Sequence, residues 1–296
     1  MGASICVLVP TYDRADVVGL TLPTWLGSRW VSEVIVVADA SSRRQLDSYE
    51  DVLAGLREAY GGRVIYELRQ GRSGSVNARN KLLELAEAEG CRYAIMADDD
   101  YVLPDPDFPL MMSRWLLADS EVGAVGGRVE QLRRRSEDPD FFLNVPLPIA
   151  DALSRALGYV FLDVRSGPRY AEYLTPFFML RGELLGRVRY DAAYDTPTAF
   201  REESDVHEQV RRLGYRLVMD PRVYVYHLGL EYGGDRLGIP MGERMYWKAR
   251  NHAKFVMKWR REPLRTWHLL AGALLLATYR PWHAVEVLKG LRDGLH

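Results

Sequence analysis

The sequence predicts an α/β fold in which strands and helices alternate around a mixed sheet flanked by helices. Three observations support this prediction. Apolar, β-branched runs of strand length recur along the first hundred residues. Segments of helix length separate these runs. Acidic residues follow the strands, where open α/β sheets bind ligands. The 296 residues suffice for one large α/β domain or two small ones.

The first strand is expected at residues 5–10, because this run is apolar and β-branched, as in a buried parallel strand. The other expected strands of this half are residues 33–39, 63–68 and 92–98, and the expected helices are residues 16–28, 44–60 and the segment from the glycine loop to Gly90. After about Val129 the pattern becomes irregular, with prolines at 139, 146 and 148.

Composition places the chain among ordinary globular proteins, with 48% hydrophobic and 27% charged residues. A net charge of −1 gives no overall argument for nucleic-acid binding. Cys6 and Cys91 each lie in an apolar run, so we expect buried, reduced thiols and a reducing compartment. The 34 arginines against five lysines, with few Asn and Gln, are typical of a thermophile, because Asn and Gln are thermolabile.

No secretory signal is recognised at the start of the sequence, since no basic region precedes the first apolar run. The longest apolar stretch is Trp267–Tyr279. As a helix it would be about 20 Å long, whereas the hydrocarbon core of a bilayer is about 30 Å thick. We therefore expect no membrane-spanning helix here.

Three consecutive carboxylates, Asp98, Asp99 and Asp100, directly follow the fourth apolar run. Adjacent anions repel one another, so this triplet is either a solvated loop or a site for a cation. Mg²⁺ and Mn²⁺ prefer oxygen ligands, and one or two carboxylates with phosphate oxygens form a common site. The triplet therefore favours a divalent metal, with a neighbouring carboxylate free to hold a ribose.

Candidate nucleotide contacts follow the earlier strands. Thr11 and Tyr12 follow a strand-ending proline, where they either open a capped helix or present a stacking ring and backbone to a nucleotide. Asp39 ends the second strand and could accept hydrogen bonds from a base or ribose. Gly71 and Gly74 precede Arg79 at a helix start suited to anions, and a guanidinium can grip a diphosphate. The spacing is not that of a Walker loop.

The order of these motifs resembles the inverting family 2 glycosyltransferases of GT-A fold. The resemblance rests on residues 9–14, 36–41, 74–80 and 98–100, and it continues through residues 173–185 and 200–227. It implies a GT-A, Rossmann-like nucleotide-diphospho-sugar fold. Two positions depart from the usual family pattern. Ala38 stands where many members have an aspartate, and Glu203 stands where many have the catalytic aspartate.

The resemblance also implies roles for the site residues. Glu203 is the expected general base, with Glu202 and Asp205 as competitors, unless these acids only favour a helix N-terminus. Asp100 is the expected metal ligand, Asp98 lies nearer the ribose, and Asp99 is undecided between them. His227 either completes the shell of a Mn²⁺ or Mg²⁺ ion or is structural. The remaining expected donor contacts are Pro10, Thr11, Tyr12, Arg14, Asp39, Gly74 and Arg79.

The C-terminal stretch Arg244–Arg265 contains eight Lys or Arg residues and one acid, Glu262, with aromatic residues interleaved. Basic, tryptophan-rich, amphipathic segments are typical of membrane-surface anchors. The alternative is a helix pair packed on the catalytic domain with a solvated basic face. Nucleic-acid binding is a third option that no recognised binding fold accompanies.

The sequence thus predicts a metal-dependent, inverting glycosyltransferase acting on a hydroxyl or lipid-linked acceptor, peripherally at the cytoplasmic face of the cell membrane. We expect a catalytic domain at residues 1–235, with a nucleotide-sugar half (1–128) and an acceptor half (129–235), followed by a C-terminal helical region (236–296). GDP-mannose is slightly favoured as the donor. The alternatives are a sugar-1-phosphate nucleotidyltransferase and a non-catalytic nucleotide-sugar or membrane-surface binding module.

Overall fold

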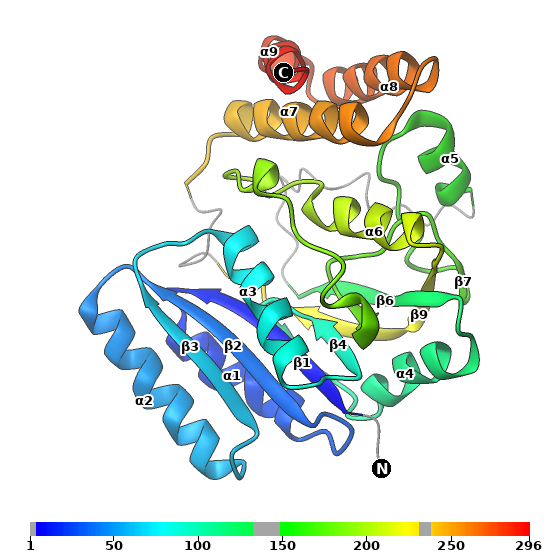
Figure 1. Ribbon diagram of the computed structural model, residues 1–296. Helices are drawn as coiled ribbons and strands as arrows, with labels where there is room; N and C mark the ends of the chain where they lie inside the picture. The colour runs from blue at the N-terminus through cyan, green and yellow to red at the C-terminus, as the bar shows by residue number, and fades with distance from the viewer. Residues whose placement is uncertain (1–3, 133–148, 231–237) are drawn as a thin grey trace.

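The computed structural model describes residues 4–132, 149–230 and 238–296. Its strands form one mixed sheet in the order β3-β2-β1-β4-β8-β6-β9-β5, with β7 paired to β9 (Figure 1). The expected α/β class is confirmed. Part of the irregular segment after Val129, including its three prolines, lies outside the described residues.

The N-terminal half contains the alternating elements that the sequence predicts. The strands β1 (Ile5–Tyr12), β2 (Glu33–Ala40), β3 (Val64–Gln70) and β4 (Tyr93–Met96) are mutually parallel. The helices between them are α1 (Ala15–Leu26), α2 (Arg43–Ala59) and α3 (Ser75–Ala88). Each expected element is present, and its ends differ from the prediction by no more than a few residues.

The sheet has an apolar core on each face because alternate strand side chains point to opposite sides. In β1, Val7 and Val9 pack toward α1 and α2, whereas Cys6 and Leu8 pack toward α3. Helix α4 (Phe108–Ala118) covers the first of these faces, and α6 (Glu202–Arg212) covers the second (Figure 1). Both faces of these strands are buried, which explains their uninterrupted apolar sequences.

The second half completes the sheet with antiparallel and short strands. β8 (Phe178–Arg181) lies between β4 and β6 (Val122–Gln131) and is antiparallel to both. β9 (Arg216–His227) pairs in parallel with β6 and antiparallel with β5 (Tyr101–Val102) and β7 (Arg169–Tyr170). The β5–β9 pair matters for the site, because Tyr101 is directly opposite His227 and brings that histidine to the acid triplet.

The prediction of reduced thiols is wrong: Cys6 and Cys91 form a disulfide. Both cysteines are buried, as expected, but the parallel pairing of β1 with β4 brings their Cα atoms to 5.9 Å. This separation is ordinary for a disulfide. The sequence alone could not reveal it, because 85 residues separate the two cysteines. The thiols therefore give no support to a reducing compartment.

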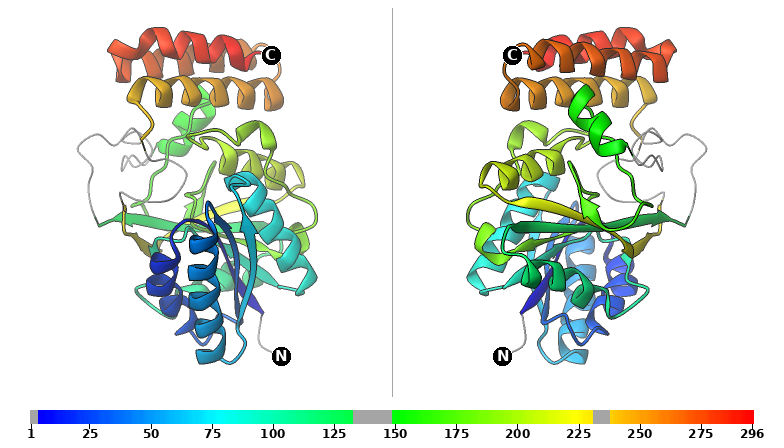
Figure 2. Two further views of the ribbon diagram at one scale, coloured as in Figure 1. Left: turned by 90° about the vertical axis from the view of Figure 1, so that its left-hand side faces the viewer. Right: turned by 90° about the vertical axis from the view of Figure 1, so that its right-hand side faces the viewer.

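Three helices form a layer beyond α6: α7 (Met241–Trp259), α8 (Leu264–Tyr279) and α9 (Ala284–Gly294). Helix α7 faces α6 and the sheet, and α8 and α9 lie on its outer side (Figure 2). These helices and α5 (Ala150–Leu157) share a third apolar cluster that includes Met245, Leu276 and Val287. In the part of the chain that the structure describes, no helix is both long and apolar enough to cross a bilayer.

The basic stretch that begins at Arg244 is not an open basic surface. Lys248 is buried beside the ring of Phe200, and Arg250 donates to the carbonyl of Ala193. Lys258 forms ion pairs with Asp191 and Asp205, and Arg260 forms one with Glu208. The alternation of cations with aromatic residues in α7 thus reflects an interface within the protein.

His207 in α6 generates a prediction about acid stability. Its ring is fully buried against Phe178, and neither ring nitrogen has a hydrogen-bond partner among the described residues. Burial, with a smaller contribution from Arg211, lowers the pKa of His207 to about 3. The unfolded chain should bind a proton here below about pH 6.5 while the folded chain does not. His207 should therefore reduce stability increasingly as the pH falls from 6.5 toward 3.

We expect His207→Leu to weaken this pH dependence by up to about 1.4 kcal/mol per pH unit. The measurement is urea unfolding of both proteins at pH 7.5, 6.0 and 5.0. Equal changes in unfolding free energy for the two proteins across this range would contradict the prediction.

Candidate functional site

The predicted site residues meet at the carboxyl ends of the parallel strands. In the register of the sheet, Tyr12 at the end of β1 is opposite Asp39 in β2. β4 ends at Met96, beside Leu8, and leads directly into the acid triplet. The first two strands and the fourth therefore deliver their polar residues to one edge of the sheet, as expected for an open α/β fold.

Asp99 and Asp100 form a buried acidic centre held by Arg14. Arg14 Nη1 lies 3.0 Å from Asp99 Oδ1 and 3.3 Å from Asp100 Oδ2. Thr11 Oγ1 donates to Asp99 Oδ2 at 2.7 Å. Burial, together with the neighbouring Asp100, raises the pKa of Asp99 to about 7 against the opposing effect of Arg14. Two buried carboxylates so close together require a cation, and here Arg14 supplies it.

The acidic centre also fits a divalent cation. His227 Nε2 lies 3.1 Å from Asp100 Oδ2, and Nδ1 of the same ring lies 2.6 Å from Gln131 Oε1. Metal–ligand bonds of about 2.1 Å at right angles place neighbouring ligand atoms about 3 Å apart. The separation of the Asp100 and His227 atoms matches this value. Gln131 would fix the ring orientation, as partners of metal-binding histidines commonly do.

Two protein ligands suit Mg²⁺ or Mn²⁺, which usually keep positions for phosphate oxygens and water. Among the described residues, the one compact group of three or more His, Cys, Asp or Glu ligand atoms is Cys6, Glu33 and Cys91. Its two sulfur atoms form the disulfide, so that group is no metal site.

Asp39 forms a second polar position beside the acidic centre. Its Oδ2 atom accepts hydrogen bonds from the backbone N–H and the hydroxyl of Ser73, each at 2.6 Å. The buried Oδ1 atom has no hydrogen-bond partner in the described parts of the chain. An unsatisfied buried carboxylate oxygen is costly, so this atom suits a donor group on a bound ligand.

The glycine loop before α3 lies close to this position. Gly74 has a φ of 91°, which strongly favours glycine, and a Cβ atom there would overlap the carboxylate of Asp195. The ring of Tyr12 lies 6.0 Å from the Arg72 guanidinium carbon of the same loop. Pro10 is half-buried at the end of β1. These residues lie around Asp39, but they do not show which nucleobase the site would bind.

Arg79 joins the acid triplet to the acidic helix α6. Its side chain is only 5% exposed, and Nη2 lies 2.9 Å from Asp98 Oδ1. Glu202 Oε1 lies 3.6 Å from Nε, and Glu203 Oε1 lies 3.7 Å from Nη2. Burial opposes the charge, but Glu202 and Asp98 raise the pKa of Arg79 well above its ordinary value. In this structure the guanidinium thus binds carboxylates, and its predicted diphosphate contact stays a prediction.

The three acids at the start of α6 have different surroundings. Glu202 is fully buried and accepts from Ser75 Oγ at 3.4 Å. Glu203 is 14% exposed and has the Arg79 guanidinium nearby. Asp205 is fully buried and faces α7, where Trp259 Nε1 donates to it at 2.6 Å. Of the three, Glu203 combines partial exposure with proximity to the acid triplet through Arg79.

The sequence reasoning missed three residues that shape this site. Tyr49 in α2 hydrogen-bonds both Thr11 Oγ1 and the backbone N–H of Arg14, each at 2.8 Å. The ring of Tyr190 lies 5.5 Å from the guanidinium carbon of Arg79. Ser73 lies within the glycine loop that the sequence singled out. Tyr49 and Tyr190 gave no local signal, because each reaches the site only through tertiary packing.

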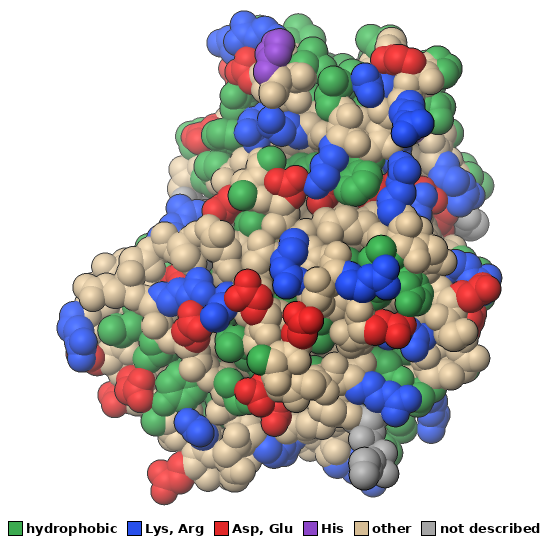
Figure 3. Space-filling model, in the orientation of Figure 1, with side chains coloured by type: hydrophobic (Ala, Val, Ile, Leu, Met, Phe, Trp, Pro, Cys, Tyr) green, Lys and Arg blue, Asp and Glu red, His purple; other side chains and the backbone are tan. Residues whose placement is uncertain are grey.

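Charged side chains of both signs are interspersed over the face of the molecule shown in Figure 3. This face has no broad basic area of the kind that binds nucleic acid through its phosphates.

Comparison with known proteins agrees with this geometry. Residues 6–151 match the family model described as Glycosyl transferase family 2. Among curated proteins, no sequence matches the chain. A solved structure of the mannosyltransferase PcManGT from Pyrobaculum calidifontis with GDP-Man and Mn²⁺ is 19% identical. The match covers 99% of this chain and 75% of that one, with a TM-score of 0.60.

Two further solved structures have the same architecture. TarS 1–349 of S. aureus with UDP-GlcNAc is 16% identical over 93% of this chain and 71% of that one, with a TM-score of 0.56. Glucosyl-3-phosphoglycerate synthase of Mycobacterium tuberculosis with Mg²⁺ and UDP is 17% identical over 88% and 82%, with a TM-score of 0.53. Residues 6–151, about half of the chain, thus resemble the family 2 glycosyltransferases, and the solved structures show that the chain has the GT-A fold.

Proposed function

We propose that the protein is a metal-dependent, inverting hexosyltransferase that moves a sugar from a nucleoside diphosphate to a hydroxyl or lipid-linked acceptor. One observation carries this proposal. Arg79 bridges Asp98, beside the acidic centre, and Glu202 and Glu203 at the start of α6. This arrangement supports the proposal because it brings the expected base, Glu203, to the same site as the expected metal ligands, and direct displacement at a sugar C1 uses both.

In this mechanism Glu203 accepts the proton of the acceptor hydroxyl as that oxygen attacks C1 and the diphosphate leaves from the opposite face. Asp39 and Asp98 hold the nucleoside part of the donor. Asp100 and His227 would hold a Mn²⁺ or Mg²⁺ ion, which when bound neutralises charge on the leaving diphosphate. Arg14 pairs with Asp99 and Asp100 and offsets their charge beside it.

The donor proposal keeps the slight preference for GDP-mannose. The solved PcManGT complex contains GDP-Man and Mn²⁺, and the TarS complex contains UDP-GlcNAc, so the fold accepts either base. Thermal-shift screening of GDP- and UDP-sugars with Mn²⁺ tests the choice, because a ligand that binds only the folded state raises its stability. A nucleotidyltransferase would instead need a basic glycine-rich loop after β1, where Val9–Arg14 has none.

We further propose that the protein binds a membrane surface through α8 and α9. Both helices, and the short 3-10 helix Pro281–His283 between them, turn large apolar side chains outward, each between 51% and 86% exposed: Leu264, Trp267, Leu270, Leu274, Trp282, Val285 and Leu288. The spacing of three or four residues places them on one face of each helix. In Figure 3, apolar and basic side chains lie together over these helices at the top of the molecule.

The occupant that fits this face is an anionic lipid surface. Exposed Lys289 and Arg292 and half-buried Arg265 and Arg280 accompany the apolar stripes. Tryptophan rings suit the headgroup level, and nearby cations attract anionic lipids. The cytoplasmic side of the membrane stays a prediction.

The first prediction of this proposal concerns the metal. Asp100→Ala should abolish the Mn²⁺-dependent part of GDP or UDP binding in calorimetry, because it removes a carboxylate ligand while Arg14 still pairs with Asp99. The control is Asp51→Ala on the exposed surface of α2, which should bind as the wild type does. Unchanged Mn²⁺-dependent affinity in Asp100→Ala would rule out the metal role.

The second prediction concerns the general base. Glu203→Gln should lower kcat about 10²- to 10⁴-fold while donor affinity is retained, because proton abstraction is lost but the donor contacts remain. Glu183→Gln, at an exposed position, is the matched control. If Glu203→Gln has a turnover near that of the wild type, Glu202 becomes the proposed general base. A non-catalytic binding module would show no turnover in any variant.

The third prediction concerns the membrane surface. Leu274→Glu should lower binding to vesicles of phosphatidylcholine with 30% phosphatidylglycerol by about tenfold or more, because it removes about 1.5–3 kcal/mol of apolar burial and adds a negative charge. Salt should weaken binding of the wild type without abolishing it, since apolar burial is not screened. Leu20→Glu, at a residue of α1 that is 64% exposed, is the control.

Point substitutions are preferable to truncation here. Gly290 and Gly294 allow the backbone of α9 to approach that of α7 at Tyr246 and Arg250, so removing α9 would uncover the interior. If wild-type protein ignores the anionic vesicles, or if both leucine variants lose binding equally, the membrane proposal fails.

A further inference from the structure

Helix α7 contacts the segment that carries the proposed base at several points along its length. At the start of that segment, Asn251 Nδ2 donates to Thr196 Oγ1 at 2.8 Å and to the carbonyl of Phe200 at 3.0 Å. His252 Nδ1 lies 3.0 Å from Arg201 Nη2. These contacts fix the chain immediately before Glu202.

Arg201 is an unusual residue at this junction. Its φ of 76° is left-handed, its side chain is buried, and Nη2 donates to the carbonyl of Gly158 at 2.5 Å. Four aromatic rings lie within 6 Å of its guanidinium carbon: Tyr159, Tyr173, Phe200 and Phe255. A strained backbone conformation persists only where the surroundings hold it, and here these rings and α7 do so.

The first turn of α6 is held through Asp205. Lys258 Nζ lies 2.9 Å from Asp205 Oδ1 and 2.7 Å from Asp191 Oδ2, and Trp259 Nε1 also donates to Asp205. Partial burial opposes the charge of Lys258, but its hydrogen bonds to the two carboxylates raise its pKa. Asp205 is fully buried, so its charge depends on these donors from α7 and on Gln209.

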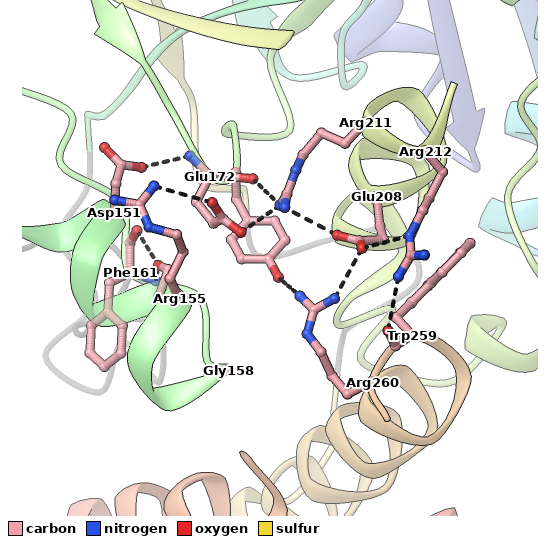
Figure 4. Close-up of polar contacts among 12 residues, drawn as sticks. Asp151, Arg155, Gly158, Phe161, Glu172, Glu208, Arg211, Arg212, Trp259 and Arg260 are labelled. Atoms are coloured by element: carbon pink, nitrogen blue, oxygen red, sulfur yellow. Dashed lines mark hydrogen bonds and ion pairs between the residues drawn. The ribbon is translucent and has the colours of Figure 1, made fainter. Parts of the chain in front are cut away.

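The end of α6 is held by a cluster of arginines around Glu208, shown in Figure 4. Glu208 is 3% exposed, and its carboxylate lies 3.0 Å from Arg260 Nη1 and 3.3 Å from both Arg211 and Arg212. Arg212 also donates to the carbonyl of Trp259 at 3.1 Å. The figure shows α6 and the end of α7 joined at this cluster.

We infer that Lys258 and Trp259 of α7 are positioning residues for the glycosyl transfer, acting through Asp205 on Glu203. The inference rests on the proposed role of Glu203. Four carboxylates lie within seven residues of α6, namely Glu202, Glu203, Asp205 and Glu208. Arg79 compensates the first two, Lys258 of α7 compensates Asp205, and Arg260, the residue after α7, compensates Glu208.

The physical reason is that Arg79 holds the Glu203 carboxylate only weakly. Its Oε1 atom lies 3.7 Å from Arg79 Nη2, beyond ordinary hydrogen-bond distance. The position of the carboxylate therefore depends on where the first turn of α6 lies. Asp205 is in that turn, two residues further on, and its contacts with Lys258 and Trp259 are at hydrogen-bond distance. A displacement of about 1 Å at a catalytic group can cost about 100-fold in rate.

The experiment compares Lys258→Met, Lys258→Arg and Lys254→Met in the full-length protein. Lys254 is one turn earlier on α7 and is the matched control. With wild type as reference, each variant is assayed for kcat and donor KM with Mn²⁺. Hydrogen exchange is measured on peptides covering residues 198–212 and, for comparison, β1 and β2.

Lys258→Met should lower kcat at least tenfold and change donor KM less than threefold, with faster exchange confined to residues 198–212. Lys258→Arg should recover most of kcat, because it restores a cation at Asp205, and Lys254→Met should behave as the wild type. Trp259→Phe, which keeps a ring but removes the N–H donor, should show a smaller effect of the same kind.

A kcat within twofold of the wild type in Lys258→Met would overturn the inference, as would faster exchange throughout the sheet. Wild-type turnover that is insensitive to Glu203→Gln would overturn the proposed base instead. In that case exchange in residues 198–212 alone decides whether α7 holds α6, and unchanged exchange there would overturn the anchoring too.

Discussion

The arrangement of the site depends on a single buried cation. Arg79 extends from α3 between the acid triplet after β4 and the acidic start of α6, two groups that belong to different halves of the chain. Removing its charge would leave Glu202 buried without its counter-ion, and breaking a buried ion pair typically costs about 3–5 kcal/mol. The guanidinium therefore both permits the carboxylates to be buried and sets the separation between the acid triplet and the start of α6.

Charge compensation of this kind recurs through the GT-A fold. Arg14 offsets Asp99 and Asp100, Lys258 of α7 offsets Asp205, and Arg260, the residue after α7, offsets Glu208. Each cluster joins elements far apart in the sequence, so the buried acidic groups also hold the molecule together. The C-terminal layer is in this sense joined to the sheet domain by charge as well as by apolar packing.

The N-terminal half could be predicted from the sequence because its signals are local. The strands β1 to β4 are buried on both faces and read as continuous apolar runs, and parallel strands deliver Asp39 and Asp98 to one edge by topology alone. The Cys6–Cys91 disulfide and the contacts of Tyr49 and Tyr190 could not be predicted, because each depends on residues that only tertiary packing brings together. The basic residues of α7 were misread for a related reason: a charge pattern does not say whether its partner is a lipid or a carboxylate of the same chain.

The stacking order of the C-terminal helices also sets the distance between a bound membrane and the candidate site. α8 and α9 lie outermost, α7 is beneath them, and α6 with Glu203 follows (Figure 2). Packed helix axes are about 8–10 Å apart, so α7 alone holds the outer helices at least that far from α6. A bilayer bound at the outer face would therefore not reach Glu203 directly. An acceptor carried in that bilayer would need a headgroup or glycan long enough to carry its hydroxyl past the helical layer, so this layer would select acceptors by length.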